Sequence, residues 1–155
     1  MFVLNLPDPE STERLGAVLA RLATREKARI GETGLFIRLE GDLGAGKTTL
    51  VRAFLRALGY AGPVKSPTFS LLESYETPDF AVHHFDFYRF EEALEFEDAG
   101  FRELFVPGAV VFTEWTDKAA PYVPEAALTI TLAHEGLGRC ATIAGVFAAE
   151  SAEAF

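Results

Sequence analysis

The feature that most constrains the fold of this chain is a glycine-rich stretch that begins at residue 41. It reads Gly41-Asp42-Leu43-Gly44-Ala45-Gly46-Lys47-Thr48 and matches the pattern G-x-x-x-x-G-K-[ST] in full. The apolar run 35–39 before it predicts a buried strand, and residues 48–58 after it predict an amphipathic helix. A glycine loop between a buried strand and a helix is typical of a phosphate-binding loop, because the N–H groups at a helix N-terminus attract anions. The sequence therefore predicts an α/β domain with a nucleotide site.

Each residue type in this loop suits phosphate chemistry. The three glycines allow backbone angles and close approaches that a Cβ atom would block. Lys47 is expected to reach the β- and γ-phosphate oxygens, and Thr48 to offer its hydroxyl to Mg²⁺. Thr49 is expected to donate to the α-phosphate. The alternative is an ordinary glycine-rich turn, which the full match and the correct flanks disfavour.

Hydrophobic periodicity and turn residues predict the elements of the rest of the chain. We expect helices at 11–27 and 91–99, a turn at 32–34, strands at 69–72, 81–85, 110–113, 128–132 and 141–143, and a helical or frayed tail after residue 147. Ser11 is expected to cap the first helix, and Gly59 to end the helix that follows the loop. The pattern predicts a P-loop NTPase-like α/β fold with a mostly parallel sheet, flanking helices and a C-terminal β-hairpin. The length suits a single domain spanning residues 1–155.

The charge of the chain is negative overall and unevenly distributed. The net charge is -9; residues 1–72 carry 10 Lys/Arg against 7 Asp/Glu, and residues 73–155 carry 4 against 16. This argues against non-specific nucleic-acid binding and against an anionic membrane surface, because binding to either is favoured by clustered cations.

No apolar run approaches the roughly 18 residues of a membrane span, and no secretory signal is evident. With one cysteine, a cytoplasmic setting is the expectation.

Two acidic residues follow predicted buried strands. Asp86 comes after the apolar run 82–85, and Glu114 comes after 110–113. Ligands gather at the carboxyl ends of parallel strands, and a P-loop enzyme needs an acidic group there to hold Mg²⁺ directly or through water. We therefore expect both carboxylates to face the γ-phosphate. The alternative is that either acid caps a loop in solvent.

Three further features flank these acids. The segment 65–68, Lys-Ser-Pro-Thr, has the position of a switch loop, in which Thr68 would sense the γ-phosphate or Mg²⁺; an ordinary Ser-Pro turn is the alternative. Trp115 follows Glu114 and is interpreted either as core packing or as a lid or partner contact. Arg89 is interpreted either as a group that neutralises transition-state charge or as one half of a surface salt bridge.

Two of the histidines and the single cysteine are interpreted as structural. His83 and His84 are adjacent on a predicted strand and therefore point to opposite faces, so they do not form the pair of ligands that a zinc site would need. Cys140 lies in the predicted hairpin with no nucleophile machinery near it in sequence. We expect it to be buried and inert.

Taken in order, several segments resemble one known family. They are Gly-Asp-Leu-Gly-Ala-Gly-Lys-Thr-Thr at 41–49, Lys-Ser-Pro-Thr-Phe at 65–69, His-Phe-Asp-Phe-Tyr-Arg at 84–89, Glu-Phe-Glu-Asp-Ala-Gly-Phe at 95–101 and Glu-Trp at 114–115. The set resembles the TsaE family, the ATPases of bacterial tRNA threonylcarbamoyladenosine biosynthesis. Many families share the P-loop alone, and the ordered set is far more diagnostic.

The resemblance implies an activity, partners and site residues. It implies binding of ATP and Mg²⁺, slow ATP hydrolysis, and work with TsaB and TsaD, of which TsaD transfers threonylcarbamoyl to an adenosine at position 37 of tRNA. It implies contact with tRNA only indirectly, through the complex. It places the catalytic and metal groups on Lys47, Thr48, Asp86 and Glu114, the switch on Ser66, Pro67 and Thr68, and the family's tryptophan on Trp115. It places ATP contacts on residues 41–49 and on Asp8, Pro9, Thr12 and Arg139.

Alternatives from other classes remain open at the level of sequence. A small-molecule P-loop kinase is the first, although such enzymes usually add an arginine-bearing lid. A GTP-binding switch is the second; it would require the base-reading motif Asn-Lys-x-Asp, and the chain has Thr-Asp-Lys-Ala at 116–119 instead. The third alternative is a nucleotide-gated binding protein, in which hydrolysis only returns the protein to its starting state. The acidic residues Glu91, Glu92, Glu95, Glu97 and Asp98 are either a solvated helix face or a surface that docks a basic partner.

Overall fold

Residues 1–155 are all described by the structure, which is a computed structural model, and they form one mixed seven-stranded sheet with flanking helices. The strands are β1 (Phe2–Leu6), β2 (Leu35–Glu40), β3 (Leu72–Glu76), β4 (Ala81–Asp86), β5 (Ala109–Glu114), β6 (Leu128–Glu135) and β7 (Gly138–Gly145). The helices are α1 (Pro9–Arg25), α2 (Lys27–Thr33), α3 (Lys47–Ala57), α4 (Glu95–Asp98) and α5 (Ala148–Ala154), with 3₁₀ turns η1 (Phe101–Leu104) and η2 (Thr116–Ala119). None of these helices is both long and apolar enough to cross a membrane.

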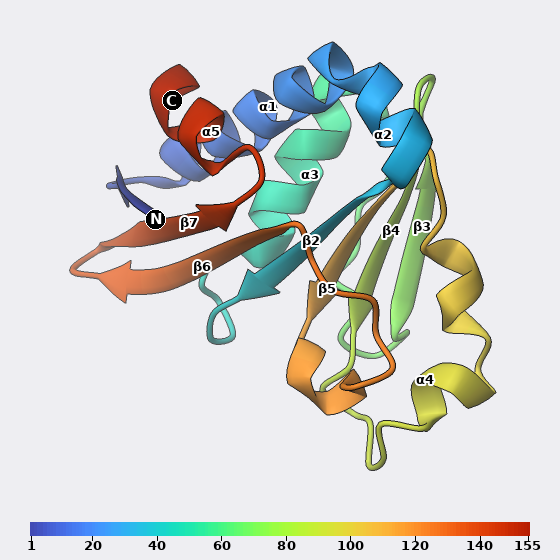
Figure 1. The fold of residues 1–155 in the computed structure, drawn as a ribbon. Coiled ribbons are helices and arrows are strands. Elements are labelled where there is room, and N and C mark those ends of the chain that lie inside the picture. Colours follow the sequence, from blue (N-terminus) through green and yellow to red (C-terminus); the bar gives the residue numbers. More distant parts are fainter.

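The sheet has the order β1-β7-β6-β2-β5-β4-β3. Its four central strands, β6, β2, β5 and β4, run parallel to one another, and antiparallel strands complete both edges. The predicted α/β fold and the predicted hairpin, formed by β6 and β7, are confirmed. The prediction missed β1, a short strand whose residues are mostly exposed and which pairs with β7. The β1–β7–β6 end of the sheet extends away from β5, β4 and β3 in Figure 1.

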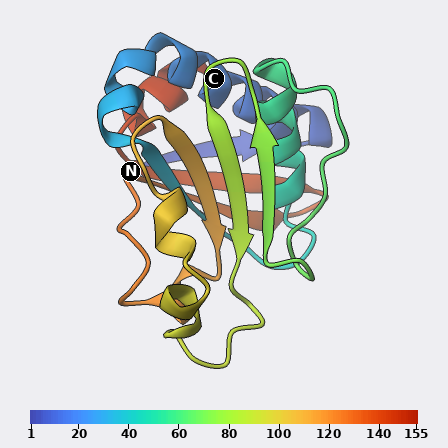
Figure 2. The ribbon, with the colours of Figure 1, turned by 90° about the vertical axis from the view of Figure 1, so that its right-hand side faces the viewer.

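The two faces of the sheet are covered by different elements. Figures 1 and 2 show α1 and α3 on one face and α4 with η1 on the other. The α1/α3 face is packed mostly by aliphatic side chains, and the opposite face by phenylalanines that include Phe85, Phe87 and Phe96. Strand β4 serves both cores by alternation, because Val82 faces the first core and Phe85 faces the second. His83 and His84 therefore point to opposite faces, as predicted.

The first helix begins earlier than the sequence pattern suggested. Asp8, not Ser11, is its N-cap, and the Asp8 carboxylate accepts hydrogen bonds from the backbone N–H of Ser11 at 2.9 Å and from its hydroxyl at 2.7 Å. Pro9 occupies the first turn, where its missing N–H costs nothing. The helix ends at Arg25, and the separate helix α2 takes in most of the predicted turn at 32–34. Gly59, with φ +95°, ends α3 as predicted.

Two predicted elements are wrong and have local causes. The strand expected at 69–72 is a series of turns, because Leu71 adopts a left-handed φ of +69° and its N–H bonds to Pro67; strand β3 starts only at Leu72. The helix expected at 91–99 shrinks to α4, because the Glu95 carboxylate accepts from the N–H groups of Glu91 and Glu92 and holds the preceding residues as a cap.

The cysteine is less buried than predicted. Cys140 lies on β7 and is half-buried rather than buried. Loss of solvent around the thiol and the nearby Glu135 both raise the pKa of Cys140. The thiol is therefore held in its protonated, less nucleophilic form.

Candidate functional site

The glycine loop joins β2 to α3 in the strand–loop–helix arrangement that the motif predicts. Gly41 needs to be glycine because a Cβ atom there would lie 2.5 Å from the carbonyl oxygen of Leu132. Gly46 is the N-cap of α3 with φ +109°, and no side chain caps the helix. The first N–H groups of α3 thus keep their capacity to bind an anion.

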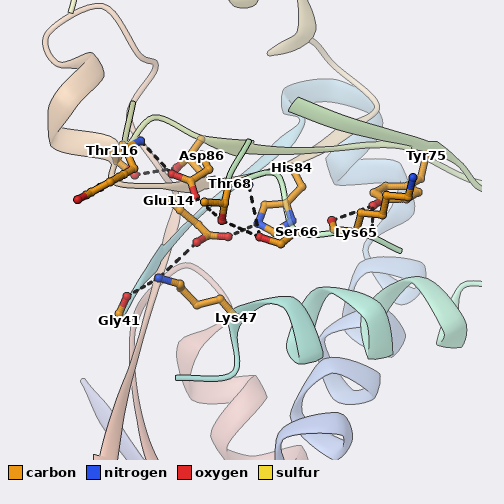
Figure 3. A network of polar contacts seen from close by, with 12 residues as sticks. Gly41, Lys47, Lys65, Ser66, Thr68, Tyr75, His84, Asp86, Glu114 and Thr116 are labelled. Atoms are coloured by element: carbon orange, nitrogen blue, oxygen red, sulfur yellow. Dashed lines mark hydrogen bonds and ion pairs between the residues drawn. The ribbon is translucent and has the colours of Figure 1, made fainter. Parts of the chain in front are cut away.

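Lys47 lies across the loop and joins it to the end of β5. Its ammonium donates a hydrogen bond to the carbonyl oxygen of Gly41 and lies 3.3 Å from a carboxylate oxygen of Glu114. Only 10% of the Lys47 side chain is exposed. The ion pair is therefore largely shielded from solvent, and this shielding makes it stronger than a surface pair. Figure 3 shows Lys47 reaching from α3 toward Glu114.

The two strand-end carboxylates lie side by side. Asp86 and Glu114 are direct partners in the parallel pairing of β4 with β5, and they are the last residues of those strands. Their exposed fractions are only 3% and 4%. Neighbouring buried carboxylates repel each other, so the pair favours a cation between or beside them.

Glu114 is held from two sides. Lys47 is on one side, and on the other the Nε2 atom of His84 lies 2.5 Å from a Glu114 oxygen. Burial alone would raise the pKa of Glu114, but the contacts with His84 and Lys47 outweigh it and hold the pKa below its ordinary value. Glu114 is therefore ionised at neutral pH, as a cation ligand must be. Sequence reasoning took His84 as structural and missed this contact; its place two residues before Asp86 on the same strand was the available signal.

The segment 65–68 brings hydroxyl groups to the acids. The Thr68 hydroxyl lies 3.3 Å from Asp86 and 2.8 Å from the Ser66 hydroxyl. The other Asp86 oxygen accepts from the backbone N–H of Tyr88 at 2.9 Å. Lys65 does not line the cavity beside the glycine loop, and its backbone contacts the Tyr75 hydroxyl. This segment therefore forms one wall of the site through Ser66 and Thr68.

Arg89 supports that wall rather than the cavity. Its Nε donates to the carbonyl oxygen of Thr68 at 3.0 Å, and its guanidinium lies 4.3 Å from the centre of the Phe69 ring. It forms no ion pair with a carboxylate, so the predicted salt bridge is absent. Arg89 does not line the cavity beside the loop either.

Trp115 lies at the cavity rather than in the core. It is 45% exposed and adopts a left-handed φ of +53°. Its ring centre is 5.0 Å from that of Tyr88. The turn that follows is anchored by the Thr113–Thr116 hydroxyl contact at 2.9 Å and by an Arg38–Asp117 ion pair at 3.0 Å. The two aromatic rings thus form a fixed, partly exposed rim.

A cavity of about 460 Å³ unites most of these groups. Its lining is Leu43, Gly44, Gly46, Lys47, Thr48, Thr49, Ser66, Thr68, Asp86, Tyr88, Glu114 and Trp115. Lys47 is the only cationic side chain in that lining. The volume suits a polyphosphate with part of a nucleoside.

A second cavity, of about 150 Å³, shares Gly44, Gly46 and Thr49 with the first and so continues it along the loop. It is lined by Leu6, Asp8, Pro9, Thr12, Gly44, Ala45, Gly46, Thr49, Leu137, Gly138 and Arg139. The four residues outside the loop that were expected to contact ATP, Asp8, Pro9, Thr12 and Arg139, therefore line one cavity. Arg139 also donates to the Gly44 carbonyl at 2.9 Å. Gly41 and Asp42 line neither of these cavities but a third one, which shares Lys47 and Trp115 with the first.

The donor set of the main cavity fits Mg²⁺. Thr48, Asp86 and Glu114 supply a hydroxyl and two carboxylates, and Mg²⁺ prefers oxygen ligands. One hydroxyl and two carboxylates leave room for water and for phosphate oxygens, which this ion usually keeps. These residues could hold the ion only together with a nucleotide.

Comparisons with known proteins agree with the geometry. The model of the family "Threonylcarbamoyl adenosine biosynthesis protein TsaE" matches residues 6–141. The chain is 36% identical over 127 residues to the tRNA threonylcarbamoyladenosine biosynthesis protein TsaE of Haemophilus influenzae, covering 82% of this chain and 78% of that protein. It is 34% identical over 129 residues to the protein of the same name from Bacillus subtilis, covering 83% and 75%. The crystal structure of YdiB from Bacillus subtilis superposes with a TM-score of 0.76 at 26% identity, covering 98% of this chain and 91% of that one.

Proposed function

Because the chain belongs to the TsaE family, we propose that it is a Mg²⁺-dependent ATPase that binds ATP at residues 41–49 and hydrolyses it slowly. Its role in tRNA threonylcarbamoyladenosine biosynthesis follows from the family. Within that role we propose an accessory part, in which the protein acts on TsaB and TsaD and does not transfer the threonylcarbamoyl group itself. It would then work in the cytoplasm and meet tRNA only through the complex.

The observation that carries the ATPase proposal is the convergence at one cavity. Lys47 and Thr48 come from the start of α3, and Asp86 and Glu114 come from the ends of β4 and β5. Segments far apart in the chain thus supply a cation, a hydroxyl and two carboxylates beside a helix N-terminus. Those are the groups that phosphoryl transfer on a P-loop requires.

Each group has a distinct task in the proposed mechanism. The N–H groups of the loop and of the first turn of α3 cradle the phosphates, and Lys47 exchanges its contact with Glu114 for the β- and γ-phosphate oxygens. Thr48 and Glu114 would hold Mg²⁺, which when bound neutralises the charge that develops on those oxygens. Asp86, with its bond to Thr68, positions the attacking water or the ion's water shell.

Slow turnover follows from the charges in the cavity. Lys47 is the only cation in its lining, and Arg89 is committed to Thr68 and Phe69. P-loop proteins without a stabilising arginine turn over at rates as low as about 10⁻⁴ per second. We therefore expect weak basal hydrolysis that TsaB and TsaD raise.

Steady-state phosphate release tests the proposed activity. Glu114→Gln and Asp86→Asn keep the size of each side chain and remove its charge, so each should lower the rate by about 100-fold or more. Glu150→Gln on α5, far from the site in sequence and fold, is the matched control and should match the wild type. Equal rates in all four proteins would contradict the site. Transfer of phosphate to a small-molecule acceptor, in place of release, would favour a kinase.

The acidic segment near α4 offers a surface for the partner proposal. Glu97 pairs with Arg102, and Glu95 caps the preceding turn, whereas Glu91, Glu92 and Asp98 form no ion pair. We propose that these three free carboxylates meet a basic surface on a partner. Figure 1 shows this segment at the same end of the molecule as the carboxyl ends of β4 and β5.

Charge reversal separates partner binding from ATP hydrolysis. A triple variant, Glu91→Lys, Glu92→Lys and Asp98→Lys, should weaken capture of TsaB and TsaD and reduce the salt dependence of that capture, with basal hydrolysis unchanged. Glu150→Lys on α5 adds positive charge elsewhere and serves as the control. If the triple variant binds as tightly as the wild type, this segment is a solvated face only.

A further inference from the structure

His84 is a polar residue at a position where the core calls for an apolar one. Its exposed fraction is 0%, and its register partner on β5 is Phe112. The centres of the His84 and Phe112 rings are 6.2 Å apart, and Phe54 packs against Phe112 from α3. An aliphatic side chain would fill this place without the cost of desolvating an imidazole.

The polar contacts of His84 are limited to one group of the site. Its Nε2 lies 2.5 Å from an oxygen of Glu114, and its Nδ1 is buried without any hydrogen-bond partner. Because an ionised carboxylate only accepts hydrogen bonds, Nε2 is the donor. The ring therefore binds no backbone group and no second side chain that would give it a purely structural polar role.

We propose that His84 is the positioning residue for Glu114, fixing one carboxylate oxygen so that the other faces Lys47 and the cavity. This inference rests on the proposed function, because it concerns how Glu114 is presented to Mg²⁺. The two oxygens are already divided in this way: one lies 2.5 Å from His84, and the other lies 3.3 Å from Lys47. A glutamate has three side-chain torsions, and a buried donor that cannot move removes most of that freedom.

The consequence concerns the competition for Glu114. Without His84, both Glu114 oxygens are free to pair with Lys47. When Lys47 then turns to phosphate, no hydrogen bond holds the carboxylate in one orientation. Partners that orient a metal ligand from behind typically change metal affinity by about 10- to 100-fold when removed. The effect should therefore fall on Mg²⁺ and leave the nucleotide contacts of the loop nearly intact.

The test follows the Mg²⁺ dependence of nucleotide binding. Trp115 is the only tryptophan and lines the cavity, so its fluorescence reports binding of the non-hydrolysable ATP analogue AMP-PNP. His84→Leu removes the donor, and His84→Gln keeps an N–H donor near the position of Nε2. We expect His84→Leu to raise the Mg²⁺ concentration at half-saturation by about 10-fold or more, with AMP-PNP affinity in EDTA unchanged. His84→Gln should restore most of the loss.

A double variant shows whether His84 acts through Glu114. If it does, His84→Leu adds nothing further to the Mg²⁺ half-saturation of Glu114→Gln. Wild-type Mg²⁺ dependence in His84→Leu would overturn the inference. It would also be overturned if His84→Leu lost AMP-PNP affinity equally with and without Mg²⁺, because that result indicates a structural role. If Glu114→Gln itself leaves the Mg²⁺ dependence unchanged, the metal role in the proposed function fails, and that outcome is distinct from a failure of His84 alone.

Discussion

The two faces of the sheet differ in what packs them and in what they position. On the α1/α3 face, two regular helices pack against aliphatic side chains, and the start of α3 places Lys47 and Thr48. On the opposite face, short helical turns and loops surround a cluster of phenylalanines. Irregular segments cannot interlock as ridges and grooves do, and large flat rings fill the uneven space between them. This difference shows that one site rests on two kinds of packing: regular helices on one face and a phenylalanine cluster on the other.

The site lies where the two supports meet. Because β4 and β5 alternate, His84 and Phe112 face α3 while Phe85 and Val111 face the phenylalanine cluster. The cluster holds the loop after β4 through Phe87, and that loop carries Tyr88 to the cavity rim. The phosphate side of the site thus depends on the helical face, and its rim depends on the other.

Removing one buried phenylalanine from each face should give the largest losses of stability. Phe54 and Phe96 are both fully buried, the first on α3 and the second on α4. Phe54→Ala and Phe96→Ala should each lower the free energy of unfolding by about 3–5 kcal/mol, measured by chemical denaturation. A loss of less than about 1 kcal/mol for Phe96→Ala would show that the phenylalanine cluster is not part of the cooperative core.

The close approach of α1 to α3 should give the next largest effect. A Cβ atom on Gly16 would lie 2.6 Å from the carbonyl oxygen of Leu50 and 2.8 Å from Cβ of Ala53. Gly16→Ala should therefore cost about 1–3 kcal/mol through overpacking. Gly31→Ala on α2 meets no atom within 4 Å and should stabilise the fold by about 0.5–1 kcal/mol. Thermal unfolding of both variants checks this, and equal shifts would contradict the packing.

The smallest effect concerns His83, on the phenylalanine side of β4. Burial lowers the pKa of His83, and Glu76 only partly offsets it; the Ser74 hydroxyl contacts its Nδ1 at 2.8 Å. The unfolded chain takes up this proton near pH 6.5, whereas the folded protein takes it up at lower pH. Stability should therefore fall as the pH drops below about 6.5.

The slope of that fall is at most about 1.4 kcal/mol per pH unit for one group. His83→Asn keeps a group able to bond to Ser74 and removes the titration. Its unfolding free energy should fall less between pH 7 and pH 5 than that of the wild type. Identical pH profiles for the two proteins would show that His83 does not contribute.

The sequence predicted the helical face well because its signals are local. The hydrophobic periodicity of residues 11–27 located α1, and the glycine motif located α3. The acids at 86 and 114 were predicted as strand-end groups because an apolar strand leads to each. Their pairing in register depends on which strands are neighbours. The local sequence around Asp86 or Glu114 does not indicate the order β2-β5-β4.

The other face was predicted poorly because a side-chain cap and a local turn override the periodicity of its segments. The acidic stretch 91–99 has helical spacing, yet capping by Glu95 leaves only α4 as helix. The apolar stretch 69–72 has the composition of a strand, yet Leu71 turns the chain before β3 begins. On the α1/α3 face, His84 looked structural because its contact with Glu114 links residues 30 positions apart. Such contacts exist only once β4 and β5 pair.

The central claim is that the loop at 41–49 binds ATP through Lys47. Equilibrium titration of the wild type, Lys47→Ala and Lys27→Ala with ATP and Mg²⁺ tests it most directly, Lys27 being an exposed lysine paired with Asp79. Loss of a charged hydrogen-bond donor to phosphate should weaken binding by about 10- to 100-fold in Lys47→Ala, with Lys27→Ala like the wild type. Equal affinity in Lys47→Ala and the wild type would contradict the account.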